Sequence, residues 1–448
     1  MRRPLRAALT AVLATACAVT LPVTAGAATD AGGEPSGERA RARTQLVSAA
    51  PSGAAGAGTS SSMQVSANGR YVAFLSSAAD LVPGDTNKVS DVFVRDLRTH
   101  RTSRVSVASD GAQSDATSGS LGISGDGRRI AFVSSAGNLA PGGRGGIFVH
   151  DRRTGDTRRV SPADEPDDGS AGSFSYGPVM SAGGRYVAFV SNAAVLTPGV
   201  PRPGQQSYVH DLRTGTTERV SRTVDGGLPS AQSRPTSLSA DGRHVALESR
   251  AADLVPGDTN DDDDIFVHDR RTGRNERVSV ADDGAEIPAH RLHLGGGDLS
   301  ADGRYAVFET ASGTAVPGDT NNRTDVFVRD RVRRTTERVS LGVGGVQPTH
   351  HMSLSRISGN GRYVSFYGYS ANLVPGDTNR TGDVFLRDRF RGTTERVSLG
   401  VDGAQGNANS AASALDRTGR TVAFGTLADN LTPEDTNDDP DVFARLRR

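Results

Sequence analysis

Five short segments of this sequence carry three oxygen-bearing side chains at one fixed spacing, Asp-x-Asn-x-x-x-Asp. The segments comprise Asp85, Asn87 and Asp91; Asp258, Asn260 and Asp264; Asp319, Asn321 and Asp325; Asp377, Asn379 and Asp383; and Asp435, Asn437 and Asp441. Hard cations such as Ca²⁺ select carboxylate and amide oxygens as ligands. The spacing therefore predicts calcium as a ligand, bound best where extra carboxylates follow, at Asp261, Asp262 and Asp263 and at Asp438 and Asp439.

The same spacing also has an explanation without a metal ion. The segments lack the glycine at position six and the glutamate at position twelve of an EF-hand, and three side chains fall short of the ligands that Ca²⁺ takes. Asp and Asn are also favoured in turns because they hydrogen-bond their own backbone. Two interpretations stay open at this stage, a calcium loop and a capped turn.

Histidines supply a second candidate metal site. His290 and His293 lie in one lengthened segment, and His350 and His351 lie about one repeat further on. Imidazoles from neighbouring loops can hold a transition metal, but few acidic residues lie nearby in the sequence, and exposed loop histidines without such a role give the same pattern. No Gly-x-Ser-x-Gly motif occurs, and nothing marks two carboxylates as a glycosidase pair. We expect no catalytic residues and no organic cofactor.

The elements that position these residues form an internal repeat. A Gly-Arg pair opens an apolar run seven times, with 57 to 61 residues between successive glycines; these are Gly69, Gly127, Gly184, Gly242, Gly303, Gly361 and Gly419. Each unit predicts four short strands: one before the Asp-Gly or Asn-Gly turn, the apolar run, Asp-Val-Phe-Val-Arg-Asp, and Thr-Thr-Glu-Arg-Val-Ser. Short antiparallel strands in such a repeat predict an all-β fold, a single seven-bladed β-propeller with four-stranded blades.

The ends of the chain predict how the ring closes. The sequence ends after the seventh third strand, whereas Thr44-Gln45-Leu46-Val47-Ser48 resembles a fourth strand in register with the repeat. We expect this N-terminal strand to complete the last blade, because pairing the two removes two exposed strand edges.

At this level the sequence resembles the TolB-type, WD-repeat-like propeller repeat of bacteria. The similar motifs are Ser-x-Asp-Gly-Arg-x-Val-Ala-Phe, Asp-Val-Phe-Val-Arg-Asp and Thr-Gly-x-Thr-x-Arg-Val-Ser, and they recur over residues 43–448. The resemblance implies a propeller. The insert that contains Pro-Gly-Asp-Thr-Asn sets this chain apart from the plainest members.

The N-terminal residues have the pattern of a secretory signal. Residues 1–27 combine a basic start, an apolar middle and Ala25-Gly26-Ala27 as a cleavage site. Residues 28–42 are expected to form a flexible lead-in to the propeller of residues 43–448. We therefore expect a secreted, extracellular protein with no transmembrane segment in its mature chain.

Composition excludes several function classes. Basic and acidic residues balance at 51 each and form no basic run, which argues against nucleic acid as a partner. Tryptophan is absent, which disfavours a stacked carbohydrate platform. Aspartates that end each third strand (Asp96, Asp151, Asp211, Asp269, Asp330 and Asp388) are interpreted as turn caps because they recur in six units.

The sequence therefore predicts an exported, non-catalytic propeller. It is expected to bind a protein, peptide or cell-envelope ligand on the face that carries the long loops, as a monomer. The alternative is a propeller hydrolase or lyase that acts on polysaccharide. Carboxylates clustered with a His or Tyr near the ring axis would favour the enzyme, and quasi-symmetric Ser, Arg and Asp would favour the binding module.

Overall fold

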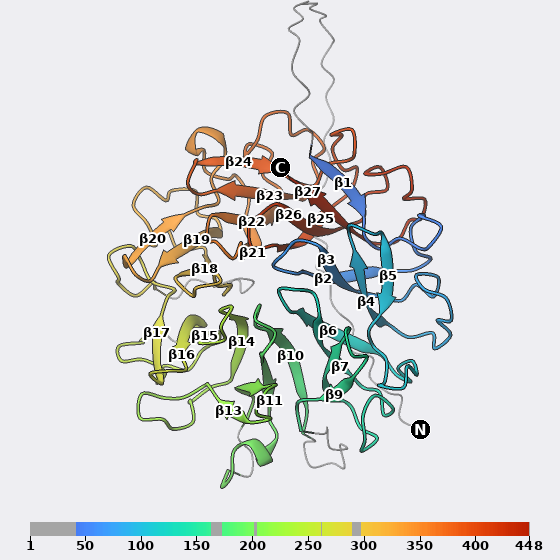
Figure 1. Ribbon diagram of the computed structural model, residues 1–448. Helices are drawn as coiled ribbons and strands as arrows, with labels where there is room; N and C mark the ends of the chain where they lie inside the picture. The colour runs from blue at the N-terminus through green and yellow to red at the C-terminus, as the bar shows by residue number, and fades with distance from the viewer. Residues whose placement is uncertain (1–41, 163–172, 201–203, 261, 289–296, 448) are drawn as a thin grey trace, which may run out of the picture. The chain divides into compact units, whose positions relative to one another are not determined.

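The computed structural model describes residues 42–162, 173–200, 204–260, 262–288 and 297–447. These residues form seven antiparallel sheets arranged as the blades of a ring (Figure 1). Between them lie only two short 3₁₀ turns, η1 (Ala194–Leu196) and η2 (Val343–Gly345), and no α-helix occurs in the described ranges. The predicted all-β, seven-bladed propeller is confirmed.

The strands follow the repeat in chain order. Blade one holds β2 (Ser60–Val65), β3 (Tyr71–Ser76), β4 (Asp91–Asp96) and β5 (Arg101–Arg104). Blade two holds β6 (Ser118–Ile123), β7 (Arg129–Ser134), β8 (Gly146–Asp151) and β9 (Thr157–Arg159). Blade three holds β10 (Ser175–Met180), β11 (Tyr186–Ser191), β12 (Gln206–Asp211) and β13 (Thr217–Arg219).

The remaining blades continue the order. Blade four holds β14 (Ser233–Leu238), β15 (His244–Ser249), β16 (Asp264–Asp269) and β17 (Arg274–Arg277). Blade five holds β18 (Tyr305–Thr310), β19 (Asp325–Asp330) and β20 (Thr335–Arg338). Blade six holds β21 (Met352–Ile357), β22 (Tyr363–Gly368), β23 (Asp383–Asp388) and β24 (Thr393–Arg396). Blade seven holds β25 (Ser410–Leu415), β26 (Thr421–Thr426), β27 (Asp441–Leu446) and β1 (Arg43–Leu46).

The core lies between the blades as well as within them. Each second strand places a buried Phe or Leu opposite an aromatic residue of the third strand; Phe74 and Phe93, for example, stack with ring centroids 5.8 Å apart. The apolar cluster around Phe74 also includes Ala423 and Val442 of blade seven. Because the first and last blades share one core, the ring depends on its closure.

The closure itself is built as predicted. Strand β1 pairs antiparallel with β27, with Arg43 opposite Leu446 and Leu46 opposite Phe443. The Val47 amide continues the contact and donates a hydrogen bond of 2.8 Å to the Val442 carbonyl. The N-terminal strand therefore supplies the outer strand of the last blade (Figure 1).

Blade five departs from the four-stranded prediction within the described residues. In place of a regular inner strand, the Gly297 amide donates to the Val307 carbonyl over 2.8 Å, and Leu299 makes a single bridge to Ala306. Gly297 has a φ of +95°, which takes the backbone out of the extended conformation. Asp298 then accepts hydrogen bonds from Ser237 Oγ (2.8 Å) and the Ile357 amide (2.9 Å), so it links blades four and six.

The two faces of the ring differ in their connections. Asp-Gly turns and Arg-Thr-Gly turns lie on one face, here called the short-turn face. The other, the long-loop face, carries the inserts between second and third strands and the connections between blades, since turns alternate along antiparallel strands. The predicted signal peptide and nearly all of the lead-in lie outside the described residues. No helix in the described ranges has the length and apolar character needed to cross a bilayer.

Candidate functional site

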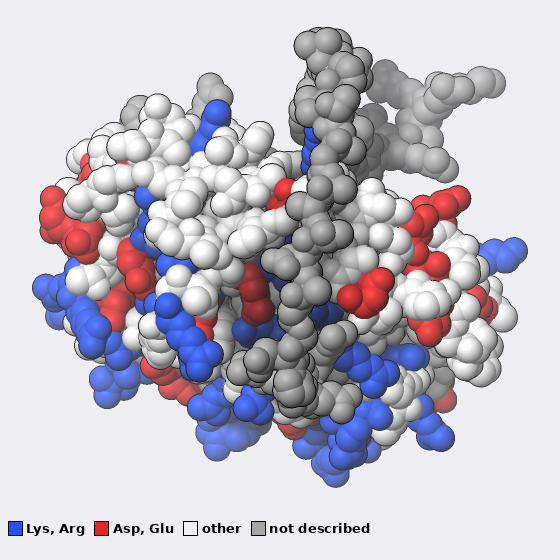
Figure 2. Space-filling view, turned by 90° about the horizontal axis from the view of Figure 1, so that it is seen from above, with Lys and Arg blue, Asp and Glu red and all other residues white. Residues whose placement is uncertain are grey.

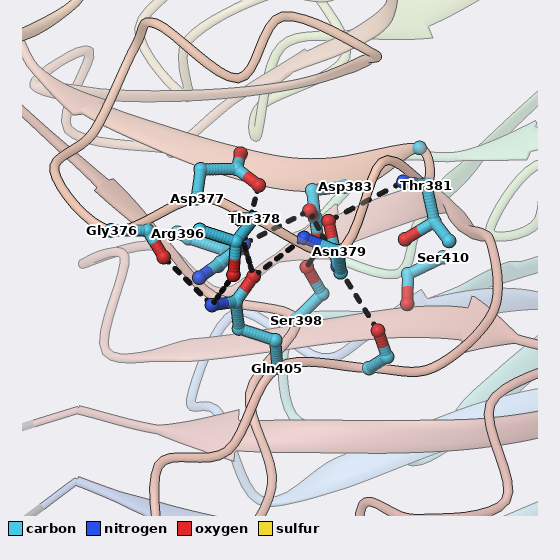
Figure 3. A network of polar contacts seen from close by, with 12 residues as sticks. Gly376, Asp377, Thr378, Asn379, Thr381, Asp383, Arg396, Ser398, Gln405 and Ser410 are labelled. Carbon is cyan, nitrogen blue, oxygen red and sulfur yellow. Dashed lines mark hydrogen bonds and ion pairs between the residues drawn. The ribbon is translucent and has the colours of Figure 1, made fainter. Parts of the chain in front are cut away.

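The structure brings together the three side chains of each Asp-x-Asn-x-x-x-Asp segment. In blade six, Asn379 Nδ2 donates to Asp383 Oδ2 over 3.1 Å and to the Gly406 carbonyl over 3.0 Å (Figure 3). Ser398 Oγ donates to the second oxygen, Asp383 Oδ1. The insert is thereby tied both to the fourth strand of its own blade and to the connection that follows.

An arginine supplies the positive charge at this position. Arg396 Nη1 lies 3.0 Å from Asp377 Oδ1 and 3.2 Å from Asp383 Oδ2 (Figure 3). The same nitrogen donates to Gln405 Oε1 over 3.1 Å, and Gln405 Nε2 donates to the Gly376 carbonyl over 2.7 Å. Asp377, Asp383, Arg396 and Gln405 therefore form one closed polar network.

The arrangement recurs in three further blades. The arginines contact the first and last aspartates of their inserts at 2.8 and 3.7 Å (Arg104), 2.9 and 3.3 Å (Arg277), and 2.9 and 3.5 Å (Arg338). Burial raises the pKa of Asp264 and of Asp325 to about 6, although the serine and arginine contacts oppose it. These arginines were not among the residues predicted from the sequence, although their constant place before Val-Ser was an available signal.

Blades two and three, whose inserts lack the Asp-x-Asn pattern, use the same arginine differently. Arg159 Nη1 donates to the Arg144 carbonyl over 3.1 Å, and Arg219 Nη2 donates to the Gly226 and Gly227 carbonyls, each over 3.1 Å. The arginine thus binds the loop backbone where no carboxylate is present.

Blade seven has the insert without the arginine. Asp435, Asn437 and Asp441 take the usual places, with Ser48 Oγ 2.5 Å from Asp441 Oδ1 and Asn437 Nδ2 2.8 Å from the Gly56 carbonyl. The strand that faces them is β1, where Leu46 occupies the arginine position. This blade is the one described case in which an insert with this pattern lacks an arginine partner.

Only part of the predicted histidine site lies within the described residues. His290 and His293 lie outside the described residues. His350 Nδ1 lies 3.1 Å from Thr349 Oγ1, and His351 Nδ1 accepts a 2.9 Å hydrogen bond from the Thr324 amide. In the described part of the chain, no three His, Cys, Asp or Glu side chains group as metal ligands.

The aspartates that end the third strands cap turns, as predicted. Asp96 Oδ1 accepts from the Arg98 amide over 3.0 Å and also pairs with Arg70, which holds the pKa of Asp96 well below its usual range. The Arg70 guanidinium lies 4.8 Å from the Tyr71 ring centroid, and Arg152 of the next blade lies 4.7 Å from the same ring. The short-turn face is therefore a rim of contacts between blades.

A cluster that does not recur lies between the inner strands of blades three and four. Arg234 Nε donates to Glu248 Oε2 over 2.6 Å. Burial raises the pKa of Tyr176; the charge of Glu248 adds to this shift and that of Arg234 opposes it. Tyr176 Oη donates to Gln205 Oε1 over 2.5 Å, and its ring stacks on Phe174 at 5.9 Å. Tyr176 and Arg234 take a position that is Ser, Gly or Ala in blades one, two, six and seven, which was the signal that the sequence offered. Glu248 takes a position that Glu309 occupies in blade five.

Glu309 is a second carboxylate outside the repeat pattern. Its Oε1 accepts from the Ser355 amide (2.8 Å) and hydroxyl (2.7 Å), and burial raises its pKa to about 7. A general acid requires such a pKa, but only 2% of Glu309 is exposed. A substrate therefore does not reach this carboxyl in the structure.

Exposed apolar side chains gather on the long-loop face. They lie in inserts, in connections or on inner strands near them: Phe174, Tyr176, Val195, Val224, Val343, Val346, Leu354, Tyr369, Val401 and Leu427. Val332 and Phe390 lie on short turns instead. Figure 2, in which the ring is seen from its rim, shows most of the visible Lys and Arg toward one face, in agreement with the arginine-rich short turns, and few toward the opposite face.

Three of the described cavities are shallow notches around the rim of the long-loop face. Each lies beside a residue pair in the middle of an insert: Ala140 and Pro141, Val255 and Pro256, or Val374 and Pro375. The notches repeat with the blades, as expected of a scaffold that presents loops.

No protein-family model matches the sequence, and no curated protein matches it. Solved structures do match the chain. An oligogalacturonate lyase in complex with manganese matches with a TM-score of 0.50 at 11% identity, over 91% of this chain and 90% of the lyase. An acylaminoacyl peptidase from Pyrococcus horikoshii matches with a TM-score of 0.51 at 11% identity, over 87% of this chain and 51% of the peptidase.

TolB from Acinetobacter baumannii matches at 17% identity with a TM-score of 0.36, over 62% of this chain and 53% of TolB. At such identities the matches show a common fold alone, because one fold serves many functions. The seven-bladed β-propeller predicted from the repeat is confirmed by the seven sheets, and the lyase and peptidase matches agree with it at the level of the fold.

Proposed function

We propose that this protein is an exported, non-catalytic propeller that binds a protein, peptide or cell-envelope ligand on its long-loop face. The supporting observation is the difference between the faces. Among the described residues, the short-turn face carries arginine–tyrosine contacts between blades and exposes two large apolar side chains, whereas the long-loop face exposes ten. Exposed apolar groups on loops held by a rigid fold are typical of a binding surface.

The polar chemistry of the inserts supports binding over catalysis. In four blades the recurring aspartates are buried and paired with an arginine, so they hold the loops rather than face a ligand. Around the inner strands, Glu248 is paired with Arg234 and Glu309 is buried. No observation favours the polysaccharide hydrolase or lyase over the binding protein.

Matched surface variants test the binding face. Val224→Asp, Val343→Asp and Val401→Asp combined change the long-loop face, and Val332→Asp with Phe390→Asp change the short-turn face. All five residues are exposed, so each substitution is expected to cost less than ~0.5 kcal/mol of stability. The wild-type protein and the short-turn variant should capture the same component of the envelope fraction, or the same glycan on an array, and the long-loop variant should lose it.

Equal capture by all three proteins would contradict the proposed face. Polysaccharide is tested in parallel by assaying for new reducing ends and for unsaturated products. Turnover by the wild-type protein would establish the enzyme instead.

Export is tested on the N-terminus. The basic start, apolar run and Ala25-Gly26-Ala27 support cleavage after residue 27. N-terminal sequencing of material from the culture medium should begin near Ala28, and a mature protein that begins at Met1 would contradict export by this route.

A further inference from the structure

Blade seven contains buried oxygens that no described group satisfies. Asp441 is fully buried and Asp435 is 8% exposed, and Oδ2 of Asp441 and Oδ1 of Asp435 have no hydrogen-bond partner among the described residues. The hydroxyl of Thr432, three residues before Asp435, is also buried without a partner in that part of the chain. Buried carboxylate oxygens without a partner are costly.

Comparison with blade six shows which side chain would otherwise bind these oxygens. Arg396 lies opposite Phe385 in the pairing of β23 with β24, and Leu46 lies opposite Phe443 in the equivalent pairing of β27 with β1. Leu46 packs in an apolar cluster with residues of blade six. The guanidinium that binds both aspartates in blade six is thus replaced by an aliphatic side chain.

Two further replacements change the side chains around Asp435 and Asp441. A bridge joins Leu399 to Gln405 in blade six, and the equivalent bridge in blade seven joins Ala49 to Ala55, so alanine replaces the glutamine that binds Arg396. Val374, which lines one notch with Arg396 and Gln405, is replaced by Thr432. Blade seven has therefore lost two long side chains and gained a hydroxyl.

Two contacts that hold the insert in blade six are retained in blade seven. Ser48 binds Asp441 as Ser398 binds Asp383, and Asn437 donates to the Gly56 carbonyl as Asn379 donates to that of Gly406. The aspartates are therefore held in the same frame, without the cation.

The electrostatics agree with this geometry. Burial, with the charges of Asp441 and Asp429, raises the pKa of Asp435 to about 7. Burial also raises the pKa of Asp441 to about 6, with a contribution from Asp439, although the hydrogen bond from the Ser48 hydroxyl opposes it. No described Lys or Arg is among the groups that shift either pKa. The pair lacks a counter-charge in the described part of the chain.

We propose that blade seven binds one Ca²⁺ between Asp435 and Asp441, in the place that arginine takes in blades one, four, five and six. The ion takes oxygens from both carboxylates and from the Thr432 hydroxyl, and backbone carbonyls and water complete the shell. Because Asp441 also holds Ser48, the ion strengthens the junction between β27 and the N-terminal segment. This site concerns ring closure and does not depend on the proposed ligand-binding face.

Calorimetric titration of the chelator-treated, full mature chain with CaCl₂ tests the site. The expected result is one ion per chain, with a Kd on the order of 10⁻⁴–10⁻³ M as in extracellular calcium modules. Leu46→Arg restores the arginine of the other blades and should abolish measurable binding, because the guanidinium takes the place of the ion as Arg396 does in blade six.

Two variants separate the site from general loss of structure. Asp383→Asn, the equivalent of Asp441 in blade six, should leave calcium binding unchanged. Leu46→Arg should fold, with a melting temperature in chelator at least that of the wild-type protein, because arginine fits this position in four blades. No binding by the wild-type chain, four or five ions per chain, or unchanged binding by Leu46→Arg would each overturn the proposal.

Discussion

Blades six and seven carry the same Asp-x-Asn-x-x-x-Asp insert but differ in what neutralises it. In blade six, Arg396 contacts Asp377 and Asp383, and Gln405 binds that arginine. In blade seven the outer strand comes from the other end of the chain and brings Leu46 instead. A protein side chain serves as the cation in one blade, and an external cation is proposed in the other.

The difference follows from how a propeller ring is closed. In blades one, four, five and six the third and fourth strands are consecutive in sequence, so the arginine lies near the insert that it binds. In blade seven the two strands are the two ends of the chain, and the junction is held by hydrogen bonds such as those of Ser48 and Val47 with residues 441 and 442. An added ion at this junction would stabilise the one blade that depends on distant segments.

The largest effect is expected from removing the closing strand. Deletion of residues 43–48 exposes the edge of β27 and removes buried Leu46 and Val47, and loss of one such side chain costs about 2–5 kcal/mol. We expect a large fall in melting temperature or aggregation, measured by thermal unfolding and light scattering. Melting at the parent temperature would show that the ring does not close here.

The next effect comes from converting blade six into blade seven. Arg396→Leu leaves the buried Asp377 and Asp383 without their cation, and breaking a buried ion pair costs about 3–5 kcal/mol. Denaturant unfolding should show this loss in chelator. Adding Gln405→Ala and Val374→Thr should make the variant bind a second Ca²⁺, whereas the exposed control Arg391→Ala should behave as the wild type. A triple variant that still binds one ion would break the equivalence of the two blades.

A smaller effect is expected on the pH dependence of stability. The pKa of Asp435 is raised to about 7 and that of Asp441 to about 6, so the folded state holds more protons than the unfolded state between about pH 4 and pH 7. These two groups therefore make the free energy of unfolding fall as pH rises through that window. In chelator, the melting temperature of Leu46→Arg relative to wild type should rise from pH 4.5 to pH 7.5.

Calcium provides the control for that measurement. It should remove most of the difference at pH 7.5 by neutralising the pair in the wild-type protein. A difference between the proteins that does not change with pH would contradict the assignment of these pKa values to blade seven.

The fold was predictable because each blade repeats local signals. Alternating apolar residues gave the strands, and the Val47-Ser48 pair in register with the repeat predicted the closure that β1 and β27 make. The turn caps such as Asp96 were also predictable, because an aspartate that binds the backbone two residues on is a local interaction.

The site was predictable only in part. The spacing identified the aspartates that converge. It did not identify the arginine of the fourth strand that pairs with them, because that contact depends on how the third and fourth strands pair. Glu309 stands out in sequence as a glutamate in an apolar run, yet its partner Ser355 belongs to the next blade. Such contacts between blades require the three-dimensional structure.

The most direct test of the blade-seven ion is a crystal structure of the mature protein with a Ca²⁺-like lanthanide, located by anomalous scattering. The account predicts one strong peak within about 2.3–2.6 Å of carboxylate oxygens of both Asp435 and Asp441. No peak is expected beside Asp377 and Asp383, where Arg396 lies. A peak at those arginine-paired aspartates, or none in blade seven, would contradict it.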